Sequence, residues 1–143
     1  MKFYLKQISL RNLKFTNMSE LSISGRKKVS SFYKEFIKVY PYLYPSLRYP
    51  NDKPVDENET IANAKNVSLG GKYVPAGDAD LSMRGNLTIA GFEKRFEEAF
   101  SIKCQIHFKK NGKWVKTGAK YDGLTLASAN KTFQEEGCDV IKL

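Results

Sequence analysis

The sequence lacks any long run of apolar residues. Nowhere do about 18 apolar residues follow one another, the length that a transmembrane helix needs, so a membrane span is not expected. Residues 1–15 alternate apolar with basic and polar residues, which is typical of a strand and not of the apolar core of a secretion signal. The sequence therefore predicts a soluble protein of the cytoplasm that does not bind membranes.

Cysteine and histidine are scarce. The chain has two cysteines, Cys104 and Cys138, and one histidine, His107. Two cysteines are too few for a disulfide framework, so both are expected to be free thiols that pack as small apolar side chains. His107 falls in a predicted strand with no cysteine or acidic ligand close to it in sequence, whereas a metal site needs several converging ligands. We expect neither a metal nor a cofactor.

Motifs for phosphate binding, calcium binding and catalysis are absent as well. Residues 70–72 lack the longer glycine span and the following hydroxyl residue of a phosphate loop. The acidic side chains between residues 52 and 59 do not have the spacing of a calcium loop, and no serine lies in a nucleophile elbow. The sequence therefore predicts that the protein is not an enzyme. An enzyme would require a concave pocket in which Asp122, His107 or Cys138 converge.

Positive charge is abundant and unevenly distributed. The formal net charge is +9. Residues 1–74 carry 13 Lys/Arg against 6 Asp/Glu, and residues 75–143 carry 11 against 9. The first half therefore holds most of the excess, which favours acidic partners for a basic surface there.

The sequence also contains an internal repeat. Residues 21–55 align with residues 81–115 at a constant shift of 60 without a gap, and nine pairs are identical. The match resumes between residues 60–65 and 125–130, where three pairs are identical. Self-similarity of this kind predicts two copies of one structural unit.

The aligned segments predict the same elements in both copies. Apolar residues recur at helical spacing over residues 28–40 and 88–100, so each copy is expected to contain one amphipathic helix. Ser30 is the expected N-cap of the first helix and Thr88 that of the second. Each helix is preceded by a short alternating strand.

The segment after each helix is predicted to be extended. Residues 102–109 alternate as a strand, and Asn111-Gly112 is a strong signal for a tight hairpin. Four prolines interrupt the corresponding part of the first copy, which favours an edge strand or a strained one. Its apolar face could be Tyr42 and Tyr44 or Leu43 and Leu47, so its register stays open. A short helical turn near residues 60–65 and 125–130 closes each copy.

This order of elements resembles the second half of the β-grasp, or ubiquitin-like, fold. The matching residues are the helix at 28–40, the strand near 46–50 and Thr60-Ile61, with their counterparts at 88–100 and Thr125-Leu126. The segment from Phe92 to Ile106 is also similar to small uncharacterised bacterial proteins that carry paired units. The resemblance covers about two thirds of the chain and implies fold and not chemistry.

The predicted fold class is therefore α+β. The chain is expected to form two tandem β-grasp-like repeats, each a mainly antiparallel sheet with one packed helix. The predicted boundaries are residues 1–74 for the first, basic repeat and residues 75–143 for the second. Units of this size bury too little surface to be stable alone, so the repeats should pack against each other.

Positions at which the two copies differ are the best candidates for a binding site. Positions that serve the fold should match, whereas positions that serve function are free to diverge. Tyr33 and Tyr49 have charged counterparts and are expected at the surface, unlike the tyrosines at positions 40, 42 and 44, which face apolar counterparts. The predicted partner-binding residues are Arg26, Lys27, Lys28, Tyr33, Lys34, Lys38 and Tyr49.

A tyrosine beside cations suits two kinds of partner. It can anchor a protein interface, or it can stack a nucleobase above lysines that contact phosphate. The leading interpretation is a non-enzymatic intracellular binding or adaptor protein whose first repeat engages a protein partner. The alternative is a nucleic-acid-binding protein that uses the same basic surface.

Overall fold

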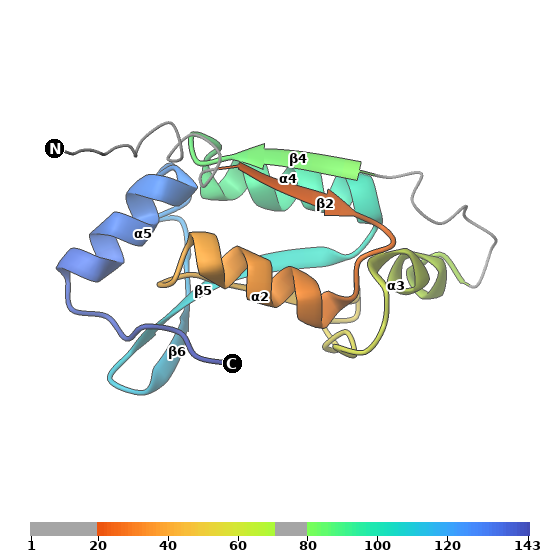
Figure 1. The fold of residues 1–143 in the computed structure, drawn as a ribbon, viewed down its shortest axis with the longest axis horizontal. Helices are drawn as coiled ribbons and strands as arrows, with labels where there is room; N and C mark the ends of the chain where they lie inside the picture. The colour runs from red at the N-terminus through yellow and green to blue at the C-terminus, as the bar shows by residue number, and fades with distance from the viewer. Residues whose placement is uncertain (1–19, 71–79) are drawn as a thin grey trace, which may run out of the picture.

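Strands and helices alternate along the chain in the computed structural model, which describes residues 20–70 and 80–143 (Figure 1). The fold class is α+β. The strand expected at residues 1–15 and the boundary expected between residues 74 and 75 lie outside the described residues. In chain order the elements are β2 (Glu20–Ser24), α2 (Val29–Val39), β3 (Tyr44–Arg48), α3 (Ile61–Ser68), β4 (Asp80–Arg84), α4 (Ile89–Phe100), β5 (Lys103–Lys110), β6 (Lys113–Lys116) and α5 (Leu126–Glu135).

The described strands form two antiparallel sheets, and each sheet combines strands from both halves of the chain. β2 pairs with β4, with Ser22 opposite Ser82. β3 pairs with β5, and β5 pairs with β6. One sheet per half was expected, but a unit of about 60 residues buries little surface by itself, and sharing strands extends the sheet across both halves.

Helices α2 and α4 lie between the two sheets. Helix α2 contacts β2 and β3, and α4 contacts β4 and β5, so each helix touches both sheets. Their apolar stripes meet through a cluster of fully buried phenylalanines. The ring centroids are 5.5 Å apart for Phe32 and Phe96, and 5.8 Å apart for Phe36 and Phe92. The helices predicted at 28–40 and 88–100 are thus confirmed, and their apolar faces form the centre of the core.

The predicted hairpin is also confirmed. Asn111 and Gly112 both have positive φ, 52° and 77°, at the turn between β5 and β6. The short turns expected near residues 60 and 125 are longer than predicted and form the helices α3 and α5. The last six residues were expected to form a strand, but they do not. Isolated backbone hydrogen bonds, such as that from the Ile141 N–H to the Pro41 carbonyl, join them to the rest of the fold. None of the described helices is long and apolar enough to cross a membrane.

The two long helices begin differently. Thr88 is the N-cap of α4, as predicted, and its hydroxyl accepts a hydrogen bond from the Gly91 backbone N–H at 3.0 Å. Ser30 is not the N-cap of α2, so that prediction is wrong. Lys28 is the N-cap and the helix begins at Val29. Backbone carbonyls of Glu59 and Glu57 accept hydrogen bonds from the N–H groups of Val29 and Ser30. Equivalent backbone hydrogen bonds join the start of α4 to the loop before α5. The two helices therefore differ only in the capping side chain, which α2 lacks.

Replacing Thr88 with alanine is expected to lower the free energy of unfolding by about 1 kcal/mol, because the Gly91 N–H loses its acceptor. Urea unfolding followed by circular dichroism measures this change. The matched variant Thr88→Ser keeps the hydroxyl and is expected to retain most of the stability. Equal losses in both variants would show that the methyl group, and not the cap, is responsible.

Candidate functional site

The three-stranded sheet has one apolar face and one polar face. Side chains alternate between the faces along each strand, and residues that oppose each other in an antiparallel pair project to the same side. Tyr44 is opposite His107, which is opposite Lys116. The side away from the core, which we call the outer face, is formed by Tyr44, Ser46, Arg48, Lys103, Gln105, His107, Lys109, Trp114 and Lys116.

Positive charge is concentrated in this sheet. Six Lys/Arg residues lie in its strands, one in β3, three in β5 and two in β6, and none of the three strands contains Asp or Glu. Four of these cations lie on the outer face. Lys103 is the only one of the four whose side chain forms an ion pair within the described residues, a contact of 3.9 Å with Asp52. The outer face therefore has a strongly positive surface.

Trp114 contacts side chains of both neighbouring strands on the outer face and stays exposed. It retains 48% of its surface accessible to solvent. Its ring centroid lies 4.9 Å from that of Tyr44 on β3, and the Lys109 Nζ lies 5.1 Å from it. A large aromatic ring fixed by an aromatic neighbour and a cation forms a ready platform for stacking.

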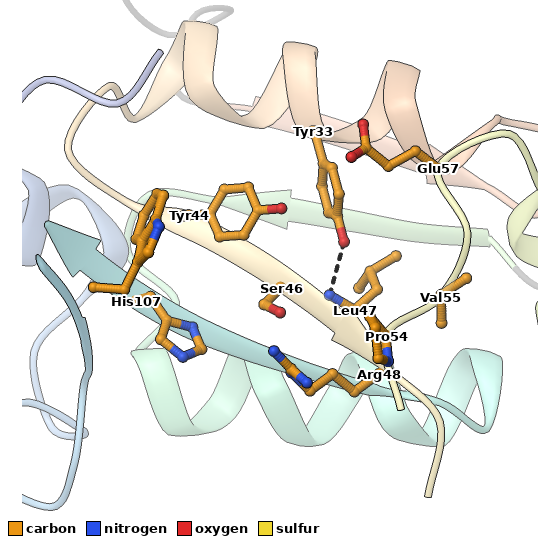
Figure 2. A pocket seen from close by; sticks show the side chains of 10 residues that line it. Tyr33, Tyr44, Ser46, Leu47, Arg48, Pro54, Val55, Glu57 and His107 are labelled. Atoms are coloured by element: carbon orange, nitrogen blue, oxygen red, sulfur yellow. Dashed lines mark hydrogen bonds between the residues drawn. The ribbon is translucent and has the colours of Figure 1, made fainter. Parts of the chain in front are cut away.

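A pocket of about 260 Å³ opens beside this platform, between β3 and the loop that follows it (Figure 2). Figure 2 shows the Tyr33 ring descending from α2, Glu57 beside it, and Arg48 and His107 on the opposite side of β3. The pocket therefore combines aromatic walls with one anionic and two basic groups. Its lining residues are Tyr33, Tyr44, Ser46, Leu47, Arg48, Pro54, Val55, Glu57, His107 and Trp114.

The surroundings of His107 in this pocket favour its neutral form. Burial lowers its pKa from the ordinary value of 6.5, and the nearby charges of Arg48 and Lys116 lower it further. Its Nδ1 lies 3.1 Å from the carbonyl oxygen of Gln105, which can only accept, so Nδ1 carries the proton. The Nε2 atom is therefore left as a hydrogen-bond acceptor.

Tyr33 is not a surface residue, and that part of the prediction is wrong. It is 3% exposed, and its hydroxyl accepts a hydrogen bond from the Leu47 backbone N–H at 2.9 Å. Its counterpart Glu93 also accepts a hydrogen bond from a strand: the Ile106 N–H donates to the Glu93 carboxylate at 2.8 Å. A tyrosine and a glutamate can thus satisfy similar strand N–H groups, so the charged counterpart did not indicate exposure.

The other predicted site residues lie away from the outer face. Arg26 and Lys28 are exposed before α2, and Lys34 and Lys38 are exposed one turn apart on that helix. Lys27 is partly buried and forms an ion pair with Glu35. Tyr49 is half-buried after β3 and packs against the core. The exposed cations form a second basic surface, the α2 surface, consisting of Arg26, Lys28, Lys34 and Lys38.

The three side chains expected to converge in an enzyme do not meet in this pocket. His107 lines it, but Asp122 and Cys138 do not. Both cysteines are free and buried. Within residues 20–70 and 80–143, no group of three or more His, Cys, Asp or Glu side chains is placed to hold a metal ion.

Several residues of the outer face were missed as site candidates, notably Trp114, Arg48 and Tyr44, and so was Glu57 of the adjacent pocket. The period of two in β5 does place Lys103, Gln105, His107 and Lys109 on one side, and this signal was available in the sequence. The position of Arg48 and Tyr44 beside them depends on the pairing of β3 with β5, which joins residues about sixty positions apart.

Comparison with protein-family models, with curated proteins and with solved structures finds no match to this chain.

Proposed function

We propose that the protein is a non-enzymatic binding protein of the cytoplasm that holds single-stranded nucleic acid on the outer face. One observation carries the proposal: the exposed ring of Trp114 lies on the same side of one sheet as four cations. Single strands are bound by such a combination, in which bases stack on aromatic rings and lysines or arginines contact the phosphates.

The composition of the outer face favours nucleic acid over protein. Three of its four cations are lysines, and lysine is depleted in protein interfaces, where long flexible side chains lose entropy and must be desolvated. Phosphate contacts do not require desolvation to the same degree, because they gain from the release of counterions. All four residues of β6 are exposed, so a strand can reach the outer face beside Trp114.

A protein partner on the α2 surface is our second proposal. Lys34 and Lys38 are exposed at positions four residues apart, a like-charge pair that slightly destabilises the helix. An acidic partner would relieve that repulsion, and the exposed cations before the helix would extend the contact. Of the two tyrosines predicted to contact the partner, only Tyr49 remains a candidate, because Tyr33 is buried.

We also propose that the fold consists of two tandem β-grasp-like repeats that share their sheets. Equivalent backbone hydrogen bonds support this relation. In each half, an alanine in the last helix donates to the glycine that follows the first strand, and the N-cap residues of the two helices form an isolated bridge. These pairs are Ala62 to Gly25 and Ala127 to Gly85, with bridges Lys28–Thr60 and Thr88–Thr125.

The test is a titration of a fluorescent oligothymidylate at low salt. The wild-type protein is expected to bind, and the variant Lys109→Glu/Lys116→Glu is expected to bind at least about tenfold more weakly, because two phosphate contacts become repulsive. The slope of log K against log salt concentration should also become shallower by about 1.4, since each contact to a single strand contributes about 0.7.

The matched control is Lys34→Glu/Lys38→Glu, which changes the net charge equally and keeps a like-charge pair on α2. It is expected to bind the oligonucleotide nearly as the wild type does. A loss confined to the control would move the site to the α2 surface, and no binding by the wild type would refute a nucleic-acid function. A loss of poly-glutamate binding in the control alone would support the second proposal.

A further inference from the structure

We propose that the pocket beside Trp114 receives one base of the bound strand and that this base is guanine. This inference rests on the proposed function. The pocket opens on the outer face, so a strand that crosses the sheet can turn one base into it. Its volume of about 260 Å³ lies below the range of roughly 300–1,000 Å³ typical of drug-sized ligands, which suits a single base.

The charged groups of the pocket match the two polar edges of guanine. Glu57 lies on the α2 side and Arg48 on the β5 side, with the hydrogen bond from the Leu47 N–H to the Tyr33 hydroxyl between them (Figure 2). Guanine carries two adjacent N–H donors, at N1 and N2, which a carboxylate accepts with both oxygens. Its next edge carries the acceptors O6 and N7, which an arginine recognises with its planar fork of donors.

Arg48 and Glu57 are both available for these contacts. One N–H of Arg48 donates to the Asp52 carbonyl oxygen at 3.0 Å, which anchors the guanidinium and leaves further donors of its five N–H groups for a ligand. The Glu57 carboxylate lies close enough to Tyr44 to raise the pKa of that phenol, although burial is the larger cause. Glu57 is exposed and so is accessible to a ligand at the pocket mouth.

Other bases fit this arrangement less well. Adenine presents the acceptor N1 where guanine presents a donor, so a carboxylate would repel it. Thymine and uracil have one ring N–H between two carbonyl oxygens, which also face a carboxylate poorly. Cytosine offers one amino group to Glu57 but lacks the second adjacent donor. Guanine is therefore the base whose donors and acceptors lie on neighbouring edges in the required order.

The test uses short oligothymidylates that carry one central guanine, adenine, cytosine or hypoxanthine. Trp114 is the only tryptophan of the chain, so its fluorescence reports binding at the pocket directly. Guanine is expected to bind about tenfold more tightly than adenine, as one well-formed bidentate base contact discriminates by this order. Hypoxanthine lacks the N2 amino group and is expected to lose part of the preference.

The variant Glu57→Gln assigns the preference to the pocket. It is expected to abolish the difference between guanine and hypoxanthine, because an amide offers one acceptor where the carboxylate offers two. The neighbouring substitution Glu59→Gln, outside the pocket lining, should preserve that difference. Equal affinity for all bases, with salt-dependent binding intact, would overturn the guanine site and leave the proposed function standing. Failure of every oligonucleotide to bind would overturn both.

Discussion

Replacing Phe96 with alanine is expected to lower the free energy of unfolding by about 3–5 kcal/mol. Phe96 is fully buried, and its ring centroid lies 5.5 Å from that of Phe32 and 4.8 Å from that of Phe100. Truncation removes these contacts and leaves a cavity between α2 and α4. Chemical denaturation at equilibrium measures the loss, which is a large share of the roughly 5–15 kcal/mol typical of a domain.

Two controls make this prediction specific. Val67→Ala alters a side chain that is 52% exposed and should change stability by less than about 0.5 kcal/mol. Phe32→Leu and Phe96→Leu combined should show a coupling of about 0.5–1.5 kcal/mol, because their rings are in contact. A loss below about 1 kcal/mol in Phe96→Ala would mean that the helices do not meet through this ring.

Replacing Tyr33 with phenylalanine is expected to lower the free energy of unfolding by about 1–3 kcal/mol. The substitution keeps the ring but removes the oxygen that accepts the hydrogen bond from Leu47, whose backbone N–H is then left unpaired in a buried position. The hydroxyl of the half-buried Tyr42 forms no such hydrogen bond among the described residues, so Tyr42→Phe is the matched control and should be nearly neutral.

The loss of folding stability at alkaline pH gives a second test of the burial of Tyr33. Burial raises the pKa of Tyr33 above its ordinary value of 10.0, and burial likewise raises the pKa of Tyr40 to about 12. The folded state therefore favours the neutral phenols. Their contribution to stability is complete below pH 10.0 and is lost as the pH rises above it. Tyr33→Phe should show a smaller alkaline loss, and an unchanged loss would contradict the assigned burial.

Local patterns in the sequence predicted the elements of the fold well. Apolar residues at helical spacing identified α2 and α4, and Asn111-Gly112 identified the hairpin, because both signals arise within a few residues of chain. Thr88 was found for the same reason. Ser30 was wrong because α2 begins at Val29 with Lys28 as its N-cap, and Lys28 has no side-chain oxygen that would mark the start of the helix in the sequence.

The candidate site was predicted less well, because it depends on contacts between distant residues. The comparison of the two halves pointed to the α2 cations and to Tyr33. It did not reveal that Arg48 and Tyr44 lie beside His107 and Trp114, which requires the pairing of β3 with β5. It also could not show that the Tyr33 hydroxyl is turned inward to a strand N–H.

The scarcity of cysteine and histidine, the positive charge and the spacing of apolar residues thus determined, from the sequence alone, an α+β chain with two amphipathic helices and no recognisable catalytic motif. These features depend on composition and on residues that are neighbours in the chain. Only the tertiary structure decided that strands from both halves share each sheet, and that one sheet places four of its six cations and Trp114 on the same side. Strand register, which relates residues far apart in sequence, is the physical reason for that difference.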